Sequence, residues 1–180
     1  NNKTFFFIIC ILFFLILFAK FYAIFSPALL GNIDLAIDEA QYIFWSKSLE
    51  TGYFSKPPFI AWALSPLNHA CGENYQCYRS LQPIAFFLSS IFCGLSTFRL
   101  TNNFKASWLS AFLFLTLPLS TFYSQFATTD AWLLLFWSAS TFFFIMTFRN
   151  GSFFWLLCCA IAVGIGLLTK YSMIFFCISA

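Results

Sequence analysis

Long uncharged runs alternate with isolated charges along most of this chain. Four runs of 19, 24, 18 and 20 residues separate successive charged side chains: from Arg79 to Arg99, from Lys105 to Asp130, from Asp130 to Arg149 and from Arg149 to Lys170. A helix needs about 20 residues to cross the hydrocarbon of a bilayer, and an ionised group at mid-bilayer costs roughly 2.5 to 3.5 kcal/mol. The charges therefore mark water boundaries, and each run predicts one membrane-spanning helix.

Six spans follow from this pattern, with a large hydrophilic loop over residues 26–80 between the first two. The predicted spans cover residues 5–25, 81–98, 107–127, 131–148, 152–169 and 171–180. Lys20 lies near one end of the first span, from which its long side chain can carry the amine to the headgroups. Because the sequence lacks an initiating methionine and ends inside the sixth span, we expect the N-terminal part of one longer transmembrane domain.

The composition favours an all-α polytopic membrane protein over a soluble domain. The 180 residues are 61% hydrophobic and 8% charged, with 29 phenylalanines and a mean hydropathy of +0.85. The net charge of +3 sums residues on two sides of a membrane. There is no basic stripe of the kind that binds nucleic acid, so we expect no nucleic-acid partner.

The distribution of basic residues favours a cytoplasmic N-terminus by a narrow margin. In that orientation all six acidic residues lie outside, and four basic residues lie inside: Lys3, Arg99, Lys105 and Arg149. Four other basic residues then lie outside: Lys47, Lys56, Arg79 and Lys170. A cleaved signal peptide is the alternative for the first segment, but its apolar run is long and no small-residue cleavage site is evident. We therefore expect loop 26–80 to be extracytoplasmic.

The outer loop holds two of the seven cysteines, Cys71 and Cys77. An oxidising compartment would allow them to form a small disulfide, and the sequence leaves this open. His69 lies beside them, but the spacing fits no familiar zinc pattern.

Within the loop, residues 38–49 are predicted to form a helix that lies at the membrane surface. Asp34 or Asp38 can cap its N-terminus, and Gly52 can stop it. Three aromatic side chains suit the headgroup region: Tyr42, Phe44 and Trp45. On these residues alone, an anchoring helix with solvated acids remains the alternative to a reactive site.

The segment YFSKPPFIAW presents Lys56 on a stiff bend, because Pro57 favours an extended conformation at the preceding residue. The apolar FIAWALSPL that follows is too short to span a membrane, so it predicts a second surface helix. A cation at headgroup depth can meet a lipid phosphate, although an ordinary snorkelling lysine would look the same. Arg79 and Asp130 are predicted to approach the same membrane face. A partly desolvated carboxylate there can act as a base, and cations can stabilise a phosphate leaving group.

Several segments, in order, resemble the N-terminal part of bacterial glycosyltransferase family 39. They are IDEAQYIFWSKSL, GYFSKPPFIAW, an arginine before the second span, TTDAWLLLFW and GIGLLTKYS. These GT-C class enzymes are related to protein O-mannosyltransferases and to the lipid A aminoarabinose transferase. The resemblance covers nearly the whole chain. It implies a GT-C-like transmembrane helix bundle in the inner (plasma) membrane, with its active site on the extracytoplasmic face.

The resemblance also implies a reaction, the inverting transfer of a sugar from a polyprenyl-phosphate donor to a lipid, glycan or protein acceptor. Asp38 would deprotonate or position the acceptor hydroxyl, and Glu39 would support it or help to bind a cation. The donor phosphate would be bound by Lys56, Arg79, Lys170 and Tyr171. Asp130 matches a second acidic position, which with Asp38 or Glu39 could hold a divalent metal ion, the one cofactor implied.

Two positions depart from the aminoarabinose branch of the family. In that branch a glutamate precedes the Lys-Pro-Pro and an arginine follows the acidic pair by two, whereas this sequence has Ser55 and Gln41. The departures argue against that particular transferase and leave the donor sugar, the acceptor and any metal open.

Two other classes of function are alternatives to a hexosyl- or pentosyltransferase. A transporter or lipid flippase should carry polar groups at mid-membrane or broken helices, and the predicted spans are almost free of charge. A purely structural membrane subunit would not need an acidic pair, a stiffly held lysine and a second aspartate on one side of the membrane.

Overall fold

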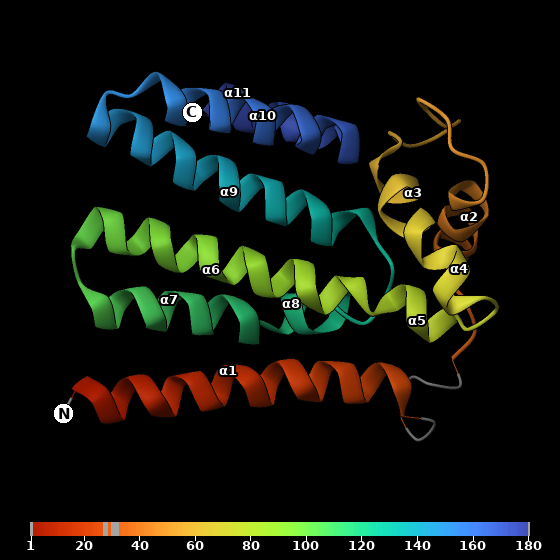
Figure 1. Cartoon of the computed structure of the whole chain (residues 1–180), viewed down its shortest axis with the longest axis horizontal. Coiled ribbons are helices and arrows are strands. Elements are labelled where there is room, and N and C mark those ends of the chain that lie inside the picture. The colour runs from red at the N-terminus through yellow and green to blue at the C-terminus, as the bar shows by residue number, and fades with distance from the viewer. Residues whose placement is uncertain (1, 27–28, 30–32, 180) are drawn as a thin grey trace.

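A computed structural model describes residues 2–26, 29 and 33–179. Most of these residues are helical, with no strand among them, as predicted for an all-α membrane protein. Five long helices lie side by side in a bundle (Figure 1): α1 (Asn2–Phe25), α6 (Leu81–Thr101), α7 (Phe104–Thr116), α9 (Thr129–Asn150) and α10 (Phe153–Thr169). Short helices α2 to α5 gather beyond one end of the bundle, where α1 ends and α6 begins.

Tight turns make neighbouring helices of the bundle antiparallel. Asn102 (φ 52°) ends α6, and Gly151 (φ 58°) ends α9, each in the left-handed conformation that stops a helix. Asn103 then caps α7, its side-chain oxygen accepting from the backbone N–H groups of Lys105 and Ala106. The chain thus reverses direction within two residues at each turn, which keeps α6 against α7 and α9 against α10.

Three segments are long and apolar enough to cross a membrane: Thr4–Phe25, Tyr75–Thr101 and Thr129–Asn150. Helices α7 and α10 are apolar but shorter, at 13 and 17 residues. The chain then continues through a 3-10 turn, η2 (Tyr171–Met173), into α11 (Ile174–Ser179). The charge spacing and the helices therefore agree on where apolar helices lie, while the boundaries of the six spans stay a prediction.

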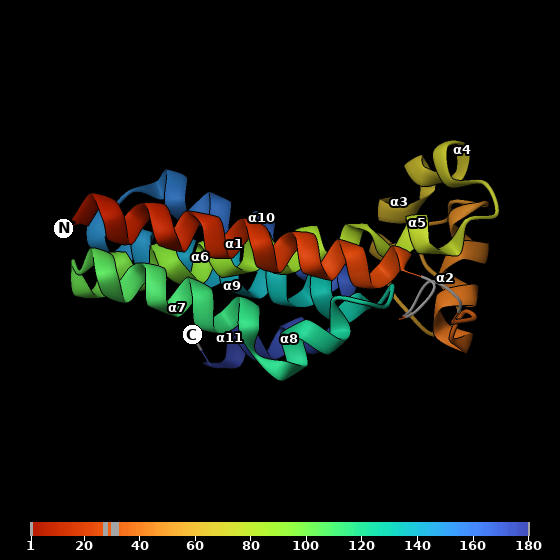
Figure 2. The ribbon, with the colours of Figure 1, turned by 90° about the horizontal axis from the view of Figure 1, so that it is seen from below.

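Predicted span 107–127 is not one continuous helix. The structure divides it into α7 and α8 (Pro118–Tyr123), with Leu117 between them at φ −51° and ψ 137°. Proline has no backbone N–H, and its ring disfavours helical geometry in the residue before it. Pro118 therefore begins a new helix, and Figure 2 shows α8 as a separate short element beyond the end of α7.

The short helices form a small subdomain with its own core. It contains α2 (Ile37–Ser46), α3 (Phe59–Leu64), the 3-10 turn η1 (Ser65–Leu67), α4 (Asn68–Cys71) and α5 (Tyr75–Arg79). The predicted second surface segment is thus helical, and the first is shorter than predicted. Tyr42 and Trp45 are buried in this core, and only Phe44, 72% exposed, remains free to meet a membrane surface. The proposed headgroup role of Tyr42 and Trp45 is therefore wrong, because α3 covers their face of the helix.

Cys71 and Cys77 form a disulfide, which settles a pairing that the sequence left open. Around it, the Tyr78 hydroxyl donates to Asn68 Oδ1 at 3.1 Å, and Asn68 Nδ2 donates to the Ser46 carbonyl at 2.8 Å. These bonds join α4 and α5 to the end of α2. The disulfide thus closes the short segment that leads directly to Arg79.

Lys20 does not reach outward as predicted. Its side chain is only 3% exposed, and Nζ donates to the Ser120 carbonyl at 3.2 Å and to Ser124 Oγ at 2.9 Å. The break before Pro118 brings the end of α8 against α1, so polar acceptors meet the amine inside the protein.

Candidate functional site

Glu39 and Arg79 form the centre of the polar network at the end of the bundle that carries the small subdomain. Arg79 Nε donates to Glu39 Oε1 at 2.9 Å, and Nη2 donates to Oε2 at 2.8 Å. Both side chains are removed from solvent, at 0% and 1% exposure. The guanidinium also donates to the carbonyls of Ile33 (3.2 Å) and Asp34 (3.0 Å), so it fixes the irregular segment before α2.

The Glu39 carboxylate joins three separate parts of the chain. Besides the two bonds from Arg79, it accepts from the backbone N–H of Ala36 at 3.1 Å and from that of Ala127 at 2.7 Å. Each oxygen thus takes two donors, which is close to the capacity of a carboxylate. Glu39 therefore links α2 to α5 and to the turn between α8 and α9. This geometry indicates that Glu39 positions α2.

Asp38, the predicted base, lies next to Glu39 in the first turn of α2 and is exposed. A helix N-terminus favours a negative charge, so the carboxylate is stabilised there without a bound cation. Because its neighbour Glu39 is held by four hydrogen bonds, the backbone that presents Asp38 is also held. Asp38 thus combines an accessible carboxylate with a rigid support.

Tyr42 connects Asp38 to the start of α9. One helical turn after Asp38, it is buried, and its side chain hydrogen-bonds with Thr129. Burial and the Asp38 carboxylate raise the pKa of the Tyr42 hydroxyl to about 12, and Asp130 adds a smaller effect in the same direction. Both carboxylates therefore raise the pKa of the same buried hydroxyl group. The four-residue spacing from Asp38 was the signal that could have identified Tyr42.

Asp130 and Lys170 form the second ion pair of the described part of the chain. Lys170 Nζ lies 2.6 Å from Asp130 Oδ1, and the two side chains are 33% and 39% exposed. Asp130 belongs to the first turn of α9, and Lys170 is in extended conformation between α10 and η2. The next residue, Tyr171, is 69% exposed. The structure thus brings the second acidic position and the Lys-Tyr pair together.

Lys56 lies at the same end of the molecule and is half-buried, without an ion pair to any residue in the described ranges. Phe59, three positions later, packs edge-on against Trp132 and Phe136 of α9, with ring centroids 5.4 and 5.0 Å apart. Trp132 is two positions from Asp130, so this contact holds the Lys-Pro-Pro bend beside the start of α9.

A cavity of about 500 Å³ extends from the Asp130–Lys170 pair into the bundle. Apart from that pair, its walls are apolar side chains and two hydroxyl groups: Phe86, Phe114, Leu117, Leu119, Leu133 and Leu134, with Ser120 and Tyr123. The cavity therefore has one charged region, at Asp130 and Lys170, and an otherwise largely apolar lining. An anionic lipid phosphate with a long apolar chain has the same division of polarity.

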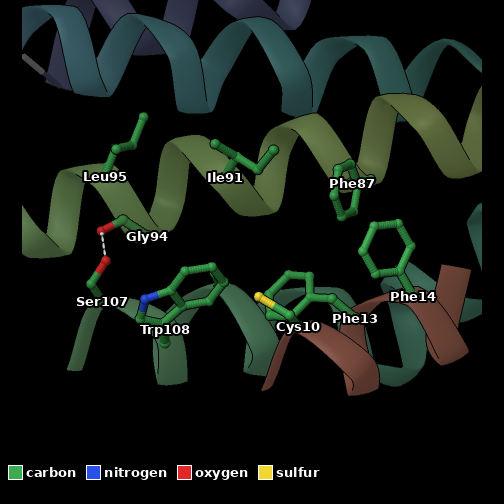
Figure 3. Close-up of a pocket in the computed structure, with 10 residues that line it drawn as sticks. Cys10, Phe13, Phe14, Phe87, Ile91, Gly94, Leu95, Ser107 and Trp108 are labelled. Atoms are coloured by element: carbon green, nitrogen blue, oxygen red, sulfur yellow. Dashed lines mark hydrogen bonds between the residues drawn. The ribbon is translucent and has the colours of Figure 1, made fainter. Parts of the chain in front are cut away.

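A smaller hollow of about 210 Å³ lies between α1, α6 and α7 (Figure 3). Phe13, Ile91 and Trp108 are among the residues that line it, and the one hydrogen bond drawn there joins Ser107 Oγ to the Gly94 carbonyl at 2.7 Å. No charged side chain lines it. This hollow can hold apolar groups, and its lining residues do not indicate a reactive site.

The predicted divalent metal ion would have to compete with protein donors at Glu39. The carboxylate oxygens of Glu39 already take protein donors, and Asp130 pairs with Lys170. Among the residues that the structure describes, no three His, Cys, Asp or Glu side chains gather as metal ligands would. A metal bound by Asp38 and Asp130 stays a prediction, and no chemical step below depends on it.

The family model described as dolichyl-phosphate-mannose-protein mannosyltransferase matches residues 55–180, and the chain belongs to this family. The match includes Lys56, Arg79, Asp130, Lys170 and Tyr171. The acidic pair before it, at positions 38 and 39, lies outside the matched region.

Two relatives of the chain are named as galacturonosyltransferases, one of lipid A and one of the lipopolysaccharide core. The chain is 32% identical over 143 residues to the lipid A galacturonosyltransferase RgtD of Rhizobium johnstonii, which covers 79% of this chain and 30% of that protein. It is 34% identical over 142 residues to the lipopolysaccharide core galacturonosyltransferase RgtB of the same organism, covering 77% and 28%. The chain thus spans under a third of these relatives. No solved structure matches it significantly.

Proposed function

We propose that this chain is part of an integral-membrane glycosyltransferase that moves a sugar from a polyprenyl-phosphate donor to an extracytoplasmic acceptor. The observation that carries the proposal is the exposed Asp38 carboxylate, held rigidly by its neighbour Glu39 near the Asp130–Lys170 pair. Membership of a mannosyltransferase family and the names of the relatives support the same class of reaction.

In the proposed reaction, the acceptor hydroxyl attacks the anomeric carbon while the bond from that carbon to the donor phosphate breaks. Asp38 takes the hydroxyl proton, and the phosphate leaves with the bonding electrons as an anion. Attack opposite the leaving group inverts the anomeric centre. Because the leaving group is stabilised by positive charge, no general acid is required.

Positive charge for the donor phosphate comes from Lys56 and Lys170 in this proposal. Lys56 is free of a protein ion pair within the described ranges, and Lys170 lines the large cavity, with the exposed Tyr171 next to it in the sequence. The apolar walls of that cavity suit the first isoprenoid units of the donor. Arg79, predicted as a further phosphate ligand, is fully buried against Glu39, so we assign it to positioning.

The acceptor to test first is lipopolysaccharide. Two relatives are named for transfer of galacturonic acid to lipid A or to the lipopolysaccharide core. A lipid acceptor fits an Asp38 that is exposed at the end of the bundle, beside the bilayer surface. A protein acceptor and sugars other than a uronic acid are the alternatives that the same assay resolves.

The site lies on the extracytoplasmic face of the inner membrane in this proposal. The Cys71–Cys77 disulfide supports that side, because disulfides persist in oxidising compartments. Mass spectrometry of protein alkylated in intact cells should find these two cysteines linked. Recovery of both as free, alkylated thiols would place this end of the bundle in the cytoplasm.

The central test is transfer by the full-length protein in membranes supplied with polyprenyl-phosphate sugar. Asp38→Asn should reduce transfer at least 100-fold while leaving membrane insertion and thermal stability unchanged. Asp34→Asn is the matched control, because Asp34 is also an exposed acid of this segment and contacts Arg79 through its backbone carbonyl. Full turnover in Asp38→Asn would remove this residue from the mechanism.

A further inference from the structure

Lys20 is a buried cation whose described partners are all neutral. Its Nζ has two hydrogen-bond acceptors, the Ser120 carbonyl and Ser124 Oγ, and lies 6.0 Å from the centroid of the Phe86 ring. The ion pairs in the described ranges involve other residues. A lysine ammonium has three N–H groups, so one donor and the full positive charge remain uncompensated. Burial of such a charge is costly unless an anion approaches it.

A recess of about 290 Å³ opens beside Lys20, between α1 and the segment from the end of α7 to Gln125. Gln125 also lines the recess and is only 7% exposed. Its Nε2 donates to the Thr121 carbonyl and to Ser124 Oγ, at 3.4 and 3.3 Å, whereas its Oε1 is buried without a partner. The recess therefore offers a cation and, independently, an unsatisfied acceptor.

The remaining walls divide the recess by polarity. Ile16, Ala19 and Ala23 of α1 supply apolar surface, and the hydroxyl-bearing Thr116 and Thr121 lie opposite. Lys20 is five residues before the end of α1, about 7.5 Å along the helix axis. That end of α1 adjoins the outer subdomain (Figure 1), so the recess lies near the boundary where lipid headgroups meet hydrocarbon.

We propose that this recess binds the headgroup of a membrane glycerophospholipid. The phosphodiester anion pairs with Lys20, and a hydroxyl or ammonium of the headgroup donates to Gln125 Oε1. The upper part of an acyl chain then lies along Ile16 and Ala19. Phosphatidylglycerol and phosphatidylethanolamine meet both requirements, whereas the choline headgroup has no N–H or O–H to donate.

This site is separate from the proposed donor site and goes beyond the proposed function. The two share a wall, because Ser120 and Phe86, which contact Lys20, also line the 500 Å³ cavity. A bound phospholipid would therefore hold α8 in place beside that cavity.

The test is native mass spectrometry of the full-length, detergent-purified protein titrated with single lipids. Phosphatidylglycerol should form a one-to-one complex, phosphatidylcholine should bind about tenfold more weakly, and diacylglycerol, which lacks phosphate, should not bind specifically. Lys20→Met should weaken phosphatidylglycerol binding at least tenfold. Lys105→Met is the control, because Lys105 is an exposed lysine near the other end of α1, over Phe5.

Gln125→Leu tests the second contact without removing the cation. It should abolish the preference for phosphatidylglycerol over phosphatidylcholine while keeping the preference over diacylglycerol. This variant, with Lys20→Arg, keeps the proposal testable if Lys20→Met does not fold. Both variants are compared by lipid affinity, so sugar transfer is not needed for the result.

Three results would overturn the proposal. One is phosphatidylglycerol binding that is the same in wild type, Lys20→Met and Gln125→Leu. Another is no specific lipid binding to the wild-type protein, as expected if further parts of the full-length protein fill the recess. The third is displacement of the lipid by inorganic phosphate at equal concentration, which would indicate a site for a free anion.

Discussion

Arg79 and Glu39 form a bidentate ion pair that is shielded from solvent, although 40 positions separate them in the sequence. Glu39 also accepts a hydrogen bond from Ala127, 88 positions away. One carboxylate thus joins the small subdomain of α2 to α5 to the turn before α9. Asp38, the adjacent residue, owes its fixed position in the first turn of α2 to this pair.

The ion pair predicts a large loss of stability when one partner is removed. Glu39→Gln or Arg79→Met should destabilise the protein by about 3 to 5 kcal/mol, because each leaves a buried charge without its partner. The double variant should lose less than the sum of the two, since the contacts are shared. Thermal unfolding in detergent measures both effects, and Glu50→Gln, at an exposed acid of the same subdomain, is the control. Equal stability of Glu39→Gln and wild type would show that the pair is not formed.

For the Asp130–Lys170 pair, we expect a small effect on stability and a large effect on activity, in contrast to the Glu39–Arg79 pair. Both side chains are partly exposed, so Lys170→Met should cost about 1 kcal/mol or less in stability. If Lys170 contacts the donor phosphate, the same change should raise KM for the donor at least tenfold. Initial rates at varied donor concentration test this, with the exposed Lys47→Met as the control. An unchanged KM would exclude Lys170 from donor binding.

Tyr42 predicts a specific loss of stability at alkaline pH. Its pKa is raised from 10.0 to about 12 in the folded protein, so unfolding favours release of the proton between these values. The stabilisation is complete below pH 10 and is lost as pH rises toward 12. The free energy of unfolding, measured from pH 9 to 11.5, should therefore fall more for wild type than for Tyr42→Phe, by about 1 to 2 kcal/mol over the range. Parallel curves for the two proteins would contradict the shift.

The contact between α6 and α7 predicts that Gly94 tolerates no larger side chain. A Cβ at position 94 would lie 3.1 Å from both the Ser107 carbonyl oxygen and Ala111 Cβ. Gly94→Val should therefore destabilise the bundle by about 1 to 3 kcal/mol. Gly164→Val is the matched control, because Gly164 is also within a helix and has no neighbour within 4 Å of the added Cβ. Thermal melts of the two variants should separate clearly, and equal melts would show that α6 and α7 are further apart.

The spacing of charges was enough to predict the apolar helices and the hydrophilic loop between α1 and α6. Ionised groups are excluded from hydrocarbon, so their positions carry information about water boundaries along the chain itself. Pro118 also carried a local signal, and the break that it causes between α7 and α8 could have been predicted. The resemblance placed Lys56, Asp130 and Lys170 at one end of the molecule, and the structure holds the segments that carry them at that end.

The functional division between Asp38 and Glu39 was decided only by the tertiary structure. The two acids are adjacent and chemically alike, yet Glu39 meets Arg79 and Ala127 while Asp38 remains exposed. The burial of Lys20 also depends on tertiary structure. Its acceptors, on Ser120 and Ser124, lie 100 and 104 positions away, in the segment that follows the break before Pro118. Local sequence determines helices through hydrophobicity and backbone geometry. Which polar side chains are buried or exposed depends on partners that only the packed helices bring together.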